Sequence, residues 1–378
     1  MICRSISFEN FRNVEAETCT FSNGVNLLWG NNAQGKSNML EGVYFFARGK
    51  SFRGAKEREL IRFSENTAAL SMEFQKDSDK FPVTLSALIP QSGKKDFLRN
   101  GGKLTSVRDM IGDFRAVLFC PAHLTLVSGG PAVRRSFMDI AISQLYPAYL
   151  AALSKYRKLI LQRNILIKDV SLGKTSADSY VWEAYAEQMS VSGAEIAYRR
   201  CLYMKDLEKS VISLFSDMTG DREAPEILYK SEAFADDGDF SPEDILSEGK
   251  DLLFRLLTEN VAREIKYGGT LFGVQKDDIT IKLNGKEARL FASQGQMRSL
   301  ALAMKLAEGE MSRTIGGEYP VFLLDDVLSE LDRERREFIL SKLSGRQIIV
   351  TACEPELFYG VGADRLIHIE NGKIIETE

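Results

Sequence analysis

The feature that most constrains the fold is a glycine-bounded loop near the start of the chain. The pattern G-x-x-x-x-G-K-[ST] is matched by Gly30-Asn31-Asn32-Ala33-Gln34-Gly35-Lys36-Ser37. The loop follows a short apolar run at residues 24–29 and precedes a helical pattern from Met39. This order surrounds a phosphate with backbone N–H groups and the positive end of a helix dipole. It predicts an α/β fold built on a phosphate-binding loop.

The residue types of this loop predict that the ligands are ATP and Mg²⁺. We expect Lys36 to reach the β- and γ-phosphates and to assist their chemistry, and Ser37 to give its hydroxyl to the metal. The whole loop and Asn38 form the expected ATP site. Arg12 is a further candidate for phosphate contact.

A second motif lies near the C-terminus, where the apolar run Val321–Leu324 ends in Asp325 and Asp326. This is the form of a Walker B strand, in which Asp325 would hold the metal and Asp326 would orient or deprotonate the attacking water. Buried strands often run into acidic turns, so the pattern is weak alone. Its pairing with the phosphate loop makes it specific.

Two shorter motifs flank this strand. Ser293-Gln294-Gly295-Gln296 opens a predicted helix from Gln294 to Glu310 and resembles a degenerate cassette signature, although an isolated S-x-G-x is more often an ordinary serine N-cap. Ser329-Glu330-Leu331-Asp332 follows the acid pair and matches a D-loop, with Ser329 and Asp332 as its site residues. In the cassette architecture the signature meets the nucleotide of another protomer, which predicts an ATP-dependent homodimer.

The periodicity of the chain divides it into a head and an insertion. Residues 1–125 are rich in strand-like runs, broken by the helix from Met39, whereas Ala132 to about Thr219 is helical, with breaks at Pro147 and at 171–173. The stretch 232–248 is expected to be an acidic loop, followed by a helix from Asp251 to Ile265. We therefore predict an ATP-binding-cassette-type ATPase head from 1–125 and 270–378, and a helical arm at 126–269.

Composition limits the environment in which such a protein works. Among its 378 residues the longest apolar runs are far below the roughly 20 needed to cross a bilayer. The N-terminus lacks an export pattern, and five scattered cysteines favour neither disulfides nor zinc. A cytoplasmic location without membrane contact is expected. The net charge of −4 means that any DNA contact must come from local basic surfaces.

The opening Asn10-Phe11-Arg12-Asn13 resembles the N-F-R-N start of the RecF family and of the related structural-maintenance (SMC) and Rad-type ATPases. Only about 255 residues separate Ser37 from Ser293, without sustained heptads, which excludes a long coiled coil. Further segments similar to the RecF family are Asn38-Met39-Leu40-Glu41-Gly42, Lys50-Ser51-Phe52-Arg53, Val117-Leu118-Phe119-Cys120-Pro121, the run 130–139 and the run 323–332.

This resemblance implies a DNA repair protein and a weak ATPase. Such a protein would bind ATP, dimerise on duplex or gapped DNA, and use slow hydrolysis as a release switch. It would work with RecO and RecR to load recombinase. Two departures stand out: Ala122-His123 replaces an acidic position of the family, and Thr351-Ala352-Cys353 stands where cassette transporters carry a switch histidine.

The DNA-contacting residues are the least specific part of this interpretation. The first candidates are Arg53, Lys56, Arg134 and Arg135; further ones are Arg58, Lys94, Lys95, Arg99, Lys155, Arg157, Lys158, Arg199 and Arg200. For each, a solvated basic face is an equal alternative. No platform of aromatic and basic residues is visible, which favours contact with the duplex backbone.

Three rival functions remain. A transporter-coupled cassette subunit would carry the switch histidine, and a small-molecule P-loop kinase would lack the signature and D-loop segments. A DNA-binding scaffold with a vestigial nucleotide site would not need the intact Lys36, Ser37 and Asp325.

Overall fold

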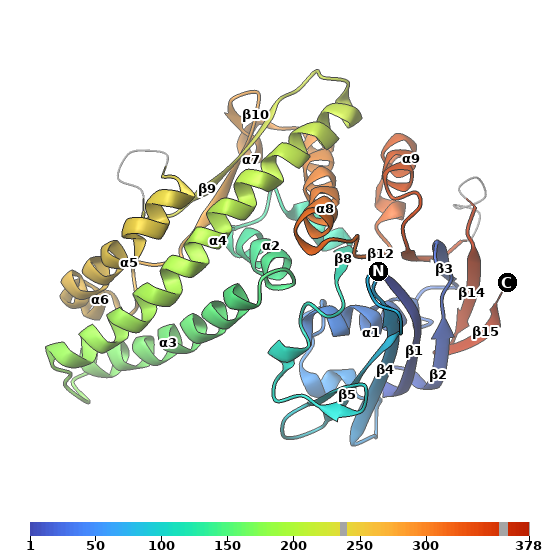
Figure 1. The fold of residues 1–378 in the computed structure, drawn as a ribbon, viewed down its shortest axis with the longest axis horizontal. Helices are drawn as coiled ribbons and strands as arrows, with labels where there is room; N and C mark the ends of the chain where they lie inside the picture. The colour runs from blue at the N-terminus through green and yellow to red at the C-terminus, as the bar shows by residue number, and fades with distance from the viewer. Residues whose placement is uncertain (235–239, 355–361, 378) are drawn as a thin grey trace. The chain divides into compact units, whose positions relative to one another are not determined.

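The computed structural model describes residues 1–234, 240–354 and 362–377, and it divides into two compact units. The first unit comprises Met1–Thr125 and Arg298–Glu378, and the second comprises Leu126–Met297. Figure 1 shows the sheets of the first unit and the long helices of the second. Among the described residues, no helix combines the length and the apolar character needed to cross a membrane.

One sheet of the first unit contains the strands that lead into the phosphate loop and into the predicted Walker B acid pair. Its order is β15-β14-β3-β13-β12-β8, with β15 antiparallel and the other strands parallel. The strands are β3 (Val25–Trp29), β8 (Ala116–Phe119), β12 (Val321–Asp325), β13 (Ile348–Ala352), β14 (Arg365–Glu370) and β15 (Lys373–Thr377). Every residue of β8, β12 and β13 is buried, as expected for parallel strands covered on both faces.

A second, antiparallel sheet has the order β2-β1-β4-β5-β6-β7. Its strands are β1 (Ile2–Phe11), β2 (Val14–Thr20), β4 (Thr67–Gln75), β5 (Val83–Pro90), β6 (Asp96–Arg99) and β7 (Gly102–Lys103). Helix α1 (Lys36–Arg48) contacts strands of both sheets, and ten of its residues are buried. At Gly42 a Cβ atom would lie 2.4 Å from the Phe8 ring, so glycine permits this close packing.

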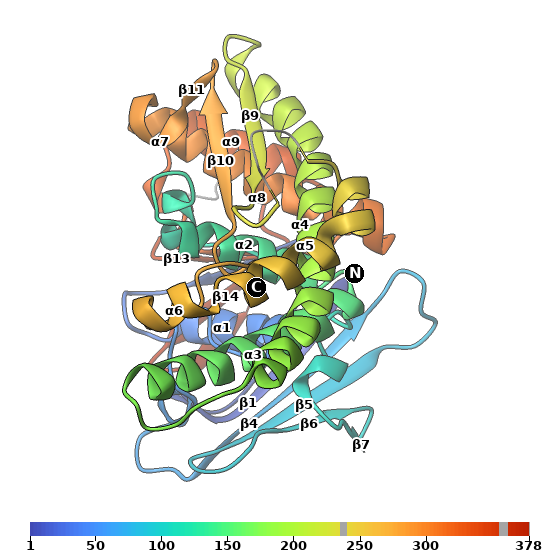
Figure 2. The same ribbon diagram turned by 90° about the vertical axis from the view of Figure 1, so that its left-hand side faces the viewer.

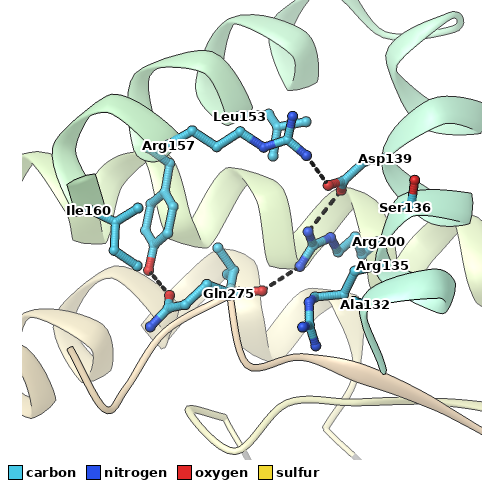
Figure 3. Close-up of a pocket in the computed structure, with 11 residues that line it drawn as sticks. Ala132, Arg135, Ser136, Asp139, Leu153, Arg157, Ile160, Arg200 and Gln275 are labelled. Atoms are coloured by element: carbon cyan, nitrogen blue, oxygen red, sulfur yellow. Dashed lines mark hydrogen bonds and ion pairs between the residues drawn. The ribbon is translucent and has the colours of Figure 1, made fainter. Parts of the chain in front are cut away.

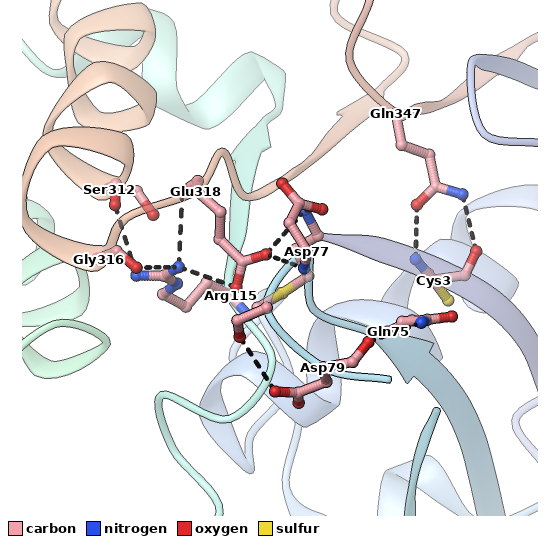
Figure 4. Close-up of polar contacts among 11 residues, drawn as sticks. Cys3, Gln75, Asp77, Asp79, Arg115, Ser312, Gly316, Glu318 and Gln347 are labelled. Carbon is pink, nitrogen blue, oxygen red and sulfur yellow. Dashed lines mark hydrogen bonds and ion pairs between the residues drawn. The ribbon is translucent and has the colours of Figure 1, made fainter. Parts of the chain in front are cut away.

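Buried polar contacts link the two ends of the chain within the first unit (Figure 4). The Gln347 side chain accepts a bond from the Cys3 N–H and donates one to the Cys3 carbonyl, both at 2.7 Å. The Arg115 guanidinium lies 3.3 Å from Glu318. The Gln347 contacts join β1 to the residue before β13, and the Arg115 contact joins the start of β8 to the segment before β12.

The remaining elements of the first unit are helical. They are η1 (Glu57–Leu60), η2 (Val107–Asp109), η3 (Pro121–Thr125), η4 (Leu328–Glu330) and α9 (Arg333–Lys342), together with most of α8 (Gln294–Gly316). A Cβ atom at Gly309 of α8 would lie 2.5 Å from the Phe322 ring of β12. The predicted signature helix and Walker B strand are therefore in direct contact.

The second unit contains long helices and a small sheet, and Figures 1 and 2 both show α3 and α4 side by side. Its helices are α2 (Pro131–Ser143), α3 (Pro147–Ser171), α4 (Ser179–Thr219), α5 (Pro242–Glu259), α6 (Val261–Tyr267) and α7 (Ala288–Phe291). Its strands, in the order β11-β10-β9, are β9 (Pro225–Lys230), β10 (Asp278–Leu283) and β11 (Lys286–Glu287). The predicted breaks at Pro147 and at 171–173 are confirmed.

Two expectations about this region were wrong. The helix predicted from Asp251 begins at Pro242, because Ser241 and Asp244 form a capping box, and it gives way to α6 at Asn260. Part of the expected acidic loop, residues 235–239, lies outside the described residues. The second unit also extends to Met297 in place of residue 269, because β10 pairs with β9.

Candidate nucleotide site

The phosphate loop connects β3 to α1 and is braced by neighbouring turns. The Gln34 carbonyl accepts bonds from the Gly372 N–H at 2.7 Å and from the Asn13 amide at 3.2 Å. A Cβ atom at Gly30 would lie 2.3 Å from the Ile369 carbonyl, so only glycine fits at its φ of 145°. The N-cap residue of α1, Gly35, has no side chain with which to cap the helix. An anion could take that place at the N–H groups of Lys36 and Ser37.

Lys36 is held inside this loop by neutral partners. Its ammonium donates to the carbonyls of Gly30 at 2.6 Å and Asn31 at 2.7 Å. The Cys353 sulfur lies 3.9 Å from the Lys36 nitrogen and 2.9 Å from the Asn32 side-chain oxygen. Because these partners carry no formal negative charge, a phosphate oxygen can compete for the ammonium.

One hydroxyl contacts both acidic residues at the end of β12, the first through its carboxylate and the second through its backbone N–H. Thr351 pairs with Asp325 in register across β12 and β13, and its Oγ1 donates to Asp325 Oδ1 at 3.1 Å. The Thr351 Oγ1 atom also accepts a hydrogen bond from the Asp326 N–H at 3.0 Å. Asp325 is buried, whereas Asp326 is exposed with φ at 51°. One carboxylate therefore lies within the strand end and the next projects beyond it.

Arg53 lies at this acid pair, although the sequence suggested only a DNA-contacting role for it. One terminal nitrogen of its guanidinium is 3.8 Å from Asp325 Oδ2, and the other donates to the Asn38 side chain at 3.0 Å. A positive charge thus faces the oxygen of Asp325 that Thr351 leaves free. The place of Arg53 depends on the fold, because 272 positions of sequence separate it from Asp325.

The donor set at this edge fits Mg²⁺. Asp325 offers a carboxylate oxygen that already faces a cation, and Ser37 lies in the first turn of α1, which contacts β12. Carboxylate and hydroxyl oxygens are the hard ligands that Mg²⁺ binds, in part through retained waters. Ser37 and Asp325 are the two residues that would hold it.

The signature and D-loop segments are ordered by their own caps. Ser293 Oγ accepts the Gln296 N–H at 3.2 Å and Gln296 Oε1 accepts the Ser293 N–H at 2.6 Å, so Ser293 does act as an N-cap. Ser293 and Gln294 are exposed, and Gly295 is half-buried. The Ser329 hydroxyl lies 3.2 Å from Asp326 Oδ1, which couples the D-loop to the acid pair.

Asp332 completes the D-loop by capping α9. Its Oδ1 accepts the Arg335 N–H at 2.9 Å, and this bond lowers the pKa of the carboxyl group. Arg335 in turn donates to Ser299 of α8 at 2.9 Å, and Arg298 of α8 donates to the Glu330 carbonyl at 3.3 Å. Hydrogen bonds therefore connect the D-loop and the start of α9 to Arg298 and Ser299 of α8, where the first unit resumes.

Several predicted residues have internal partners. Arg12 forms a two-point ion pair with buried Glu41, at 2.9 and 3.0 Å. Arg134 is buried and makes two bonds of 2.7 Å to Asp278, and Arg200 is buried against Asp139 and Asp277 at 2.8 Å. The expectation that Arg134 or Arg200 lies on an open DNA-binding face was wrong, because folding places each against carboxylates.

Other basic candidates are distributed over the surface. Lys56, Arg58, Lys94, Lys155 and Lys158 are exposed. Lys95 pairs with Glu57 at 2.7 Å, Arg199 pairs with Glu195 at 2.9 Å, and Arg99 pairs with Asp113.

The Ala122-His123 departure falls in η3, directly after β8. The His123 ring lies 3.5 Å from the Cys120 sulfur, and burial, with a contribution from Lys305, lowers the pKa of His123 to about 3. The imidazole is therefore neutral at physiological pH. Sequence reasoning also missed Thr351, whose hydroxyl contacts both Asp325 and Asp326; its place at the end of the apolar run Ile348–Val350 was the available signal.

A mainly parallel sheet carries a phosphate loop at the end of β3 and a Walker B acid pair at the end of β12, with β13 between these two strands. Together with the antiparallel sheet that α1 also contacts, this arrangement defines an ATPase head of the ATP-binding-cassette class. The family model described as the RecF/RecN/SMC N-terminal domain matches residues 2–375. The chain is 33% identical to the DNA replication and repair protein RecF of Thermoanaerobacter pseudethanolicus over 377 residues, covering all of both chains. It is 35% identical to RecF of Clostridium novyi over 351 residues, which cover 93% of this chain and 92% of that protein.

Solved structures agree with these relatives. A structure of the recombination mediator protein RecF with ATPrS, in the RecFOR pathway, matches 99% of this chain and 97% of its own with a TM-score of 0.90 and 32% identity. The SMC head domain of Pyrococcus furiosus shares the fold, with a TM-score of 0.57 at 17% identity, over 99% of this chain and 95% of that one. The chain belongs to the RecF family, and the predicted α/β head with a helical insertion is confirmed.

Proposed function

We propose that this protein is an ATP-dependent DNA-binding protein of recombinational repair that dimerises on duplex or gapped DNA and uses slow ATP hydrolysis as a release switch. Recombinase loading would proceed together with RecO and RecR, in a cytoplasmic setting. The observation that carries the proposal is that the Thr351 hydroxyl contacts both Asp325 and Asp326, beside a phosphate loop whose lysine has neutral partners among the described residues.

Different residues of the head would bind the phosphates of ATP, hold the metal and orient the attacking water. The loop from Gly30 to Ser37 would bind the phosphates through its N–H groups, with Lys36 exchanging its carbonyl partners for phosphate oxygens. Mg²⁺ would neutralise charge on the phosphates while held by Ser37 and Asp325. Asp326, exposed beyond the strand end, would orient the attacking water.

Arg53 gives this site a means of responding to nucleotide. Its guanidinium faces the Asp325 oxygen that a metal would take, so metal and arginine compete for one carboxylate. With Asp325 engaged by a metal, Arg53 would be free to contact phosphate or DNA. Arg12 would have to leave Glu41 to reach a phosphate, because both of its paired nitrogens are occupied.

Dimerisation would use the exposed start of α8. Ser293 and Gln294 lie on the surface at a helix N-terminus, with Gly295 and Gln296 beside them, where they could meet the γ-phosphate on a second copy of the chain. Slow turnover is consistent with Cys353, which contacts Lys36 in the place of a switch histidine. A thiol at that position is a poorer general base than an imidazole near neutral pH.

DNA contact would be made through backbone charge without strong sequence preference. Lys56 remains a candidate because it is exposed, together with Arg58 and Lys94. Arg53 remains one once nucleotide has released it. Arg134 is excluded by its pair with Asp278, and Arg135 lies in a pocket of the second unit.

The test is sedimentation of wild type and Lys36→Met, with and without ATP and Mg²⁺, in the presence and absence of a gapped duplex. We expect ATP to drive only the wild type to a DNA-bound dimer. A wild-type protein that binds ATP but stays monomeric and ignores DNA would refute the proposal. A partner-dependent or small-molecule ATPase would then explain the site better.

A further inference from the structure

The second unit contains a pocket with no part in ATP chemistry (Figure 3). Its volume is about 210 Å³, and its lining comes from α2, α3, α4 and the turn before β10. Leu153, Ile160 and Val274 supply an apolar wall. Arg135 of α2 and Arg157 of α3 lie on its sides, and Arg157 has 59% of its side chain exposed, so the pocket opens to solvent.

The acidic group in this pocket is fully engaged. Asp139 accepts bonds from Arg157 at 2.7 Å, from Arg200 at 2.8 Å and from the Tyr149 hydroxyl. The positive charge of Arg200 is also paired with the Asp277 carboxylate, to which Arg200 donates a hydrogen bond at 2.8 Å. These contacts form a rigid, neutralised floor that needs no ligand.

Arg135 differs from its neighbours in having no carboxylate partner within the described residues. Its one hydrogen bond there joins a terminal nitrogen to the main-chain oxygen of Asp277 at 2.8 Å, and the residue is only half-buried. The three arginines at the pocket face two carboxylates, which leaves one positive charge, located at Arg135. A partly desolvated guanidinium without a counter-charge is a strong site for a planar anion.

The size of the pocket selects among anionic ligands. Cavities that hold cofactors or drug-sized ligands measure about 300–1,000 Å³, whereas a cavity of about 150 Å³ lined by apolar side chains accepts benzene. A volume of about 210 Å³ thus fits one large side chain and excludes a nucleotide. An apolar wall beside a cation suits an apolar side chain next to a carboxylate.

We propose that this pocket docks a short segment of a protein partner in which an apolar side chain enters against Leu153, Ile160 and Val274 while an adjacent carboxylate pairs with Arg135. Anchors of this kind, buried side chains seated in a pocket with a charge at the rim, carry most of the affinity of small interfaces. A DNA phosphate fits less well, because it has no apolar group to place against Leu153, Ile160 and Val274.

The probe is N-acetyl-L-phenylalanine, which joins one apolar ring to one carboxylate, compared with its uncharged amide and with a thymidine dinucleotide. Binding is followed by the methyl NMR signals of Ile160, Leu153 and Val274 in the full chain, up to about 10 mM probe because a single anchor binds weakly. We expect saturable shifts with the acid and about tenfold weaker binding of the amide, since one ion pair is lost. This comparison needs only the wild type.

Variants localise the effect. Arg135→Ala should reduce the affinity for the acid about tenfold and leave that for the amide unchanged, whereas Ile160→Gln should weaken both. Lys158→Ala, a neighbouring exposed cation outside the pocket lining, is the matched control and should change neither. Equal binding of acid and amide, tighter binding of the dinucleotide, or no saturable shift of these methyl groups would each overturn the proposal.

Discussion

The charged groups of the nucleotide edge and those of the helical unit are arranged in opposite ways. At the edge, Lys36 donates to two carbonyls and lies 3.9 Å from the Cys353 sulfur, and Asp325 faces Arg53 across 3.8 Å. In the helical unit, Arg200 reaches Asp139 and Asp277 at 2.8 Å each. Loose, exchangeable partners leave a group free to bind a ligand, whereas saturated buried pairs hold elements together. Whether a charged group already has a full set of charged partners therefore distinguishes a binding site from the scaffold better than the charge itself.

The strongest test of this contrast is Arg200→Met. Two buried carboxylates would lose their cation, which costs about 3–5 kcal/mol of unfolding free energy. Of the two tryptophans, Trp182 is in this unit, so urea unfolding followed by its fluorescence in a Trp29→Phe background reports on it. Arg199→Gln, which breaks a more exposed pair with Glu195, should cost about 0–1 kcal/mol. Similar losses in both variants would remove the distinction.

Lys36→Met tests the opposite half of the comparison. ATP turnover should fall about 10²–10³-fold, since a preorganised phosphate contact is lost. The free energy of unfolding of the head, followed by Trp29 fluorescence in a Trp182→Phe background, should change by less than about 1 kcal/mol, because the partners released are two carbonyls and a thiol. A large loss of stability with little change in turnover would show that Lys36 is structural.

Thr351→Val sharpens the assignment of the acid pair. Loss of the hydroxyl that bonds to Asp325 and Asp326 should lower kcat about tenfold or more, with ATP affinity nearly unchanged. Thr351→Ser keeps the hydroxyl and should restore kcat. If the valine and serine variants behave alike, the hydroxyl does not position the acids and only the packing of the strand matters.

The smallest expected effect concerns His123, a scaffold group beside the nucleotide edge. Burial depresses its folded-state pKa to about 3, below the ordinary value of 6.5, so the unfolded chain binds the proton first. The stability it contributes is complete above pH 6.5 and is lost as the pH falls toward 3. Between pH 7 and 5.5 we expect His123→Asn to remove somewhat less than about 1 kcal/mol of pH dependence, allowing for solvent access to the ring. An unchanged slope in urea midpoints would contradict this.

The sequence by itself determined the motifs whose meaning is local. The loop from Gly30 to Ser37 and the run into Asp325 are contiguous, and their geometry follows from strand, turn and helix propensities within a few residues. The start of α5 was equally local, since Ser241 and Asp244 form a capping box, but the acidic composition of the region obscured it. Similarity along nearly the whole chain then placed it in its family.

Only the tertiary structure decided which side chains meet. Thr351 contacts Asp325 because β13 is the neighbour of β12 in the sheet. Arg53 lies beside the same carboxylate although most of the chain separates the two residues in sequence. Arg134, a plausible DNA contact in the sequence, is buried against Asp278, whereas Arg135, one position later, has no carboxylate partner in the part of the chain that the structure describes. Charge is visible in a sequence, but burial and partnership depend on how distant elements pack, and these decide whether a charge binds a ligand or stabilises the fold.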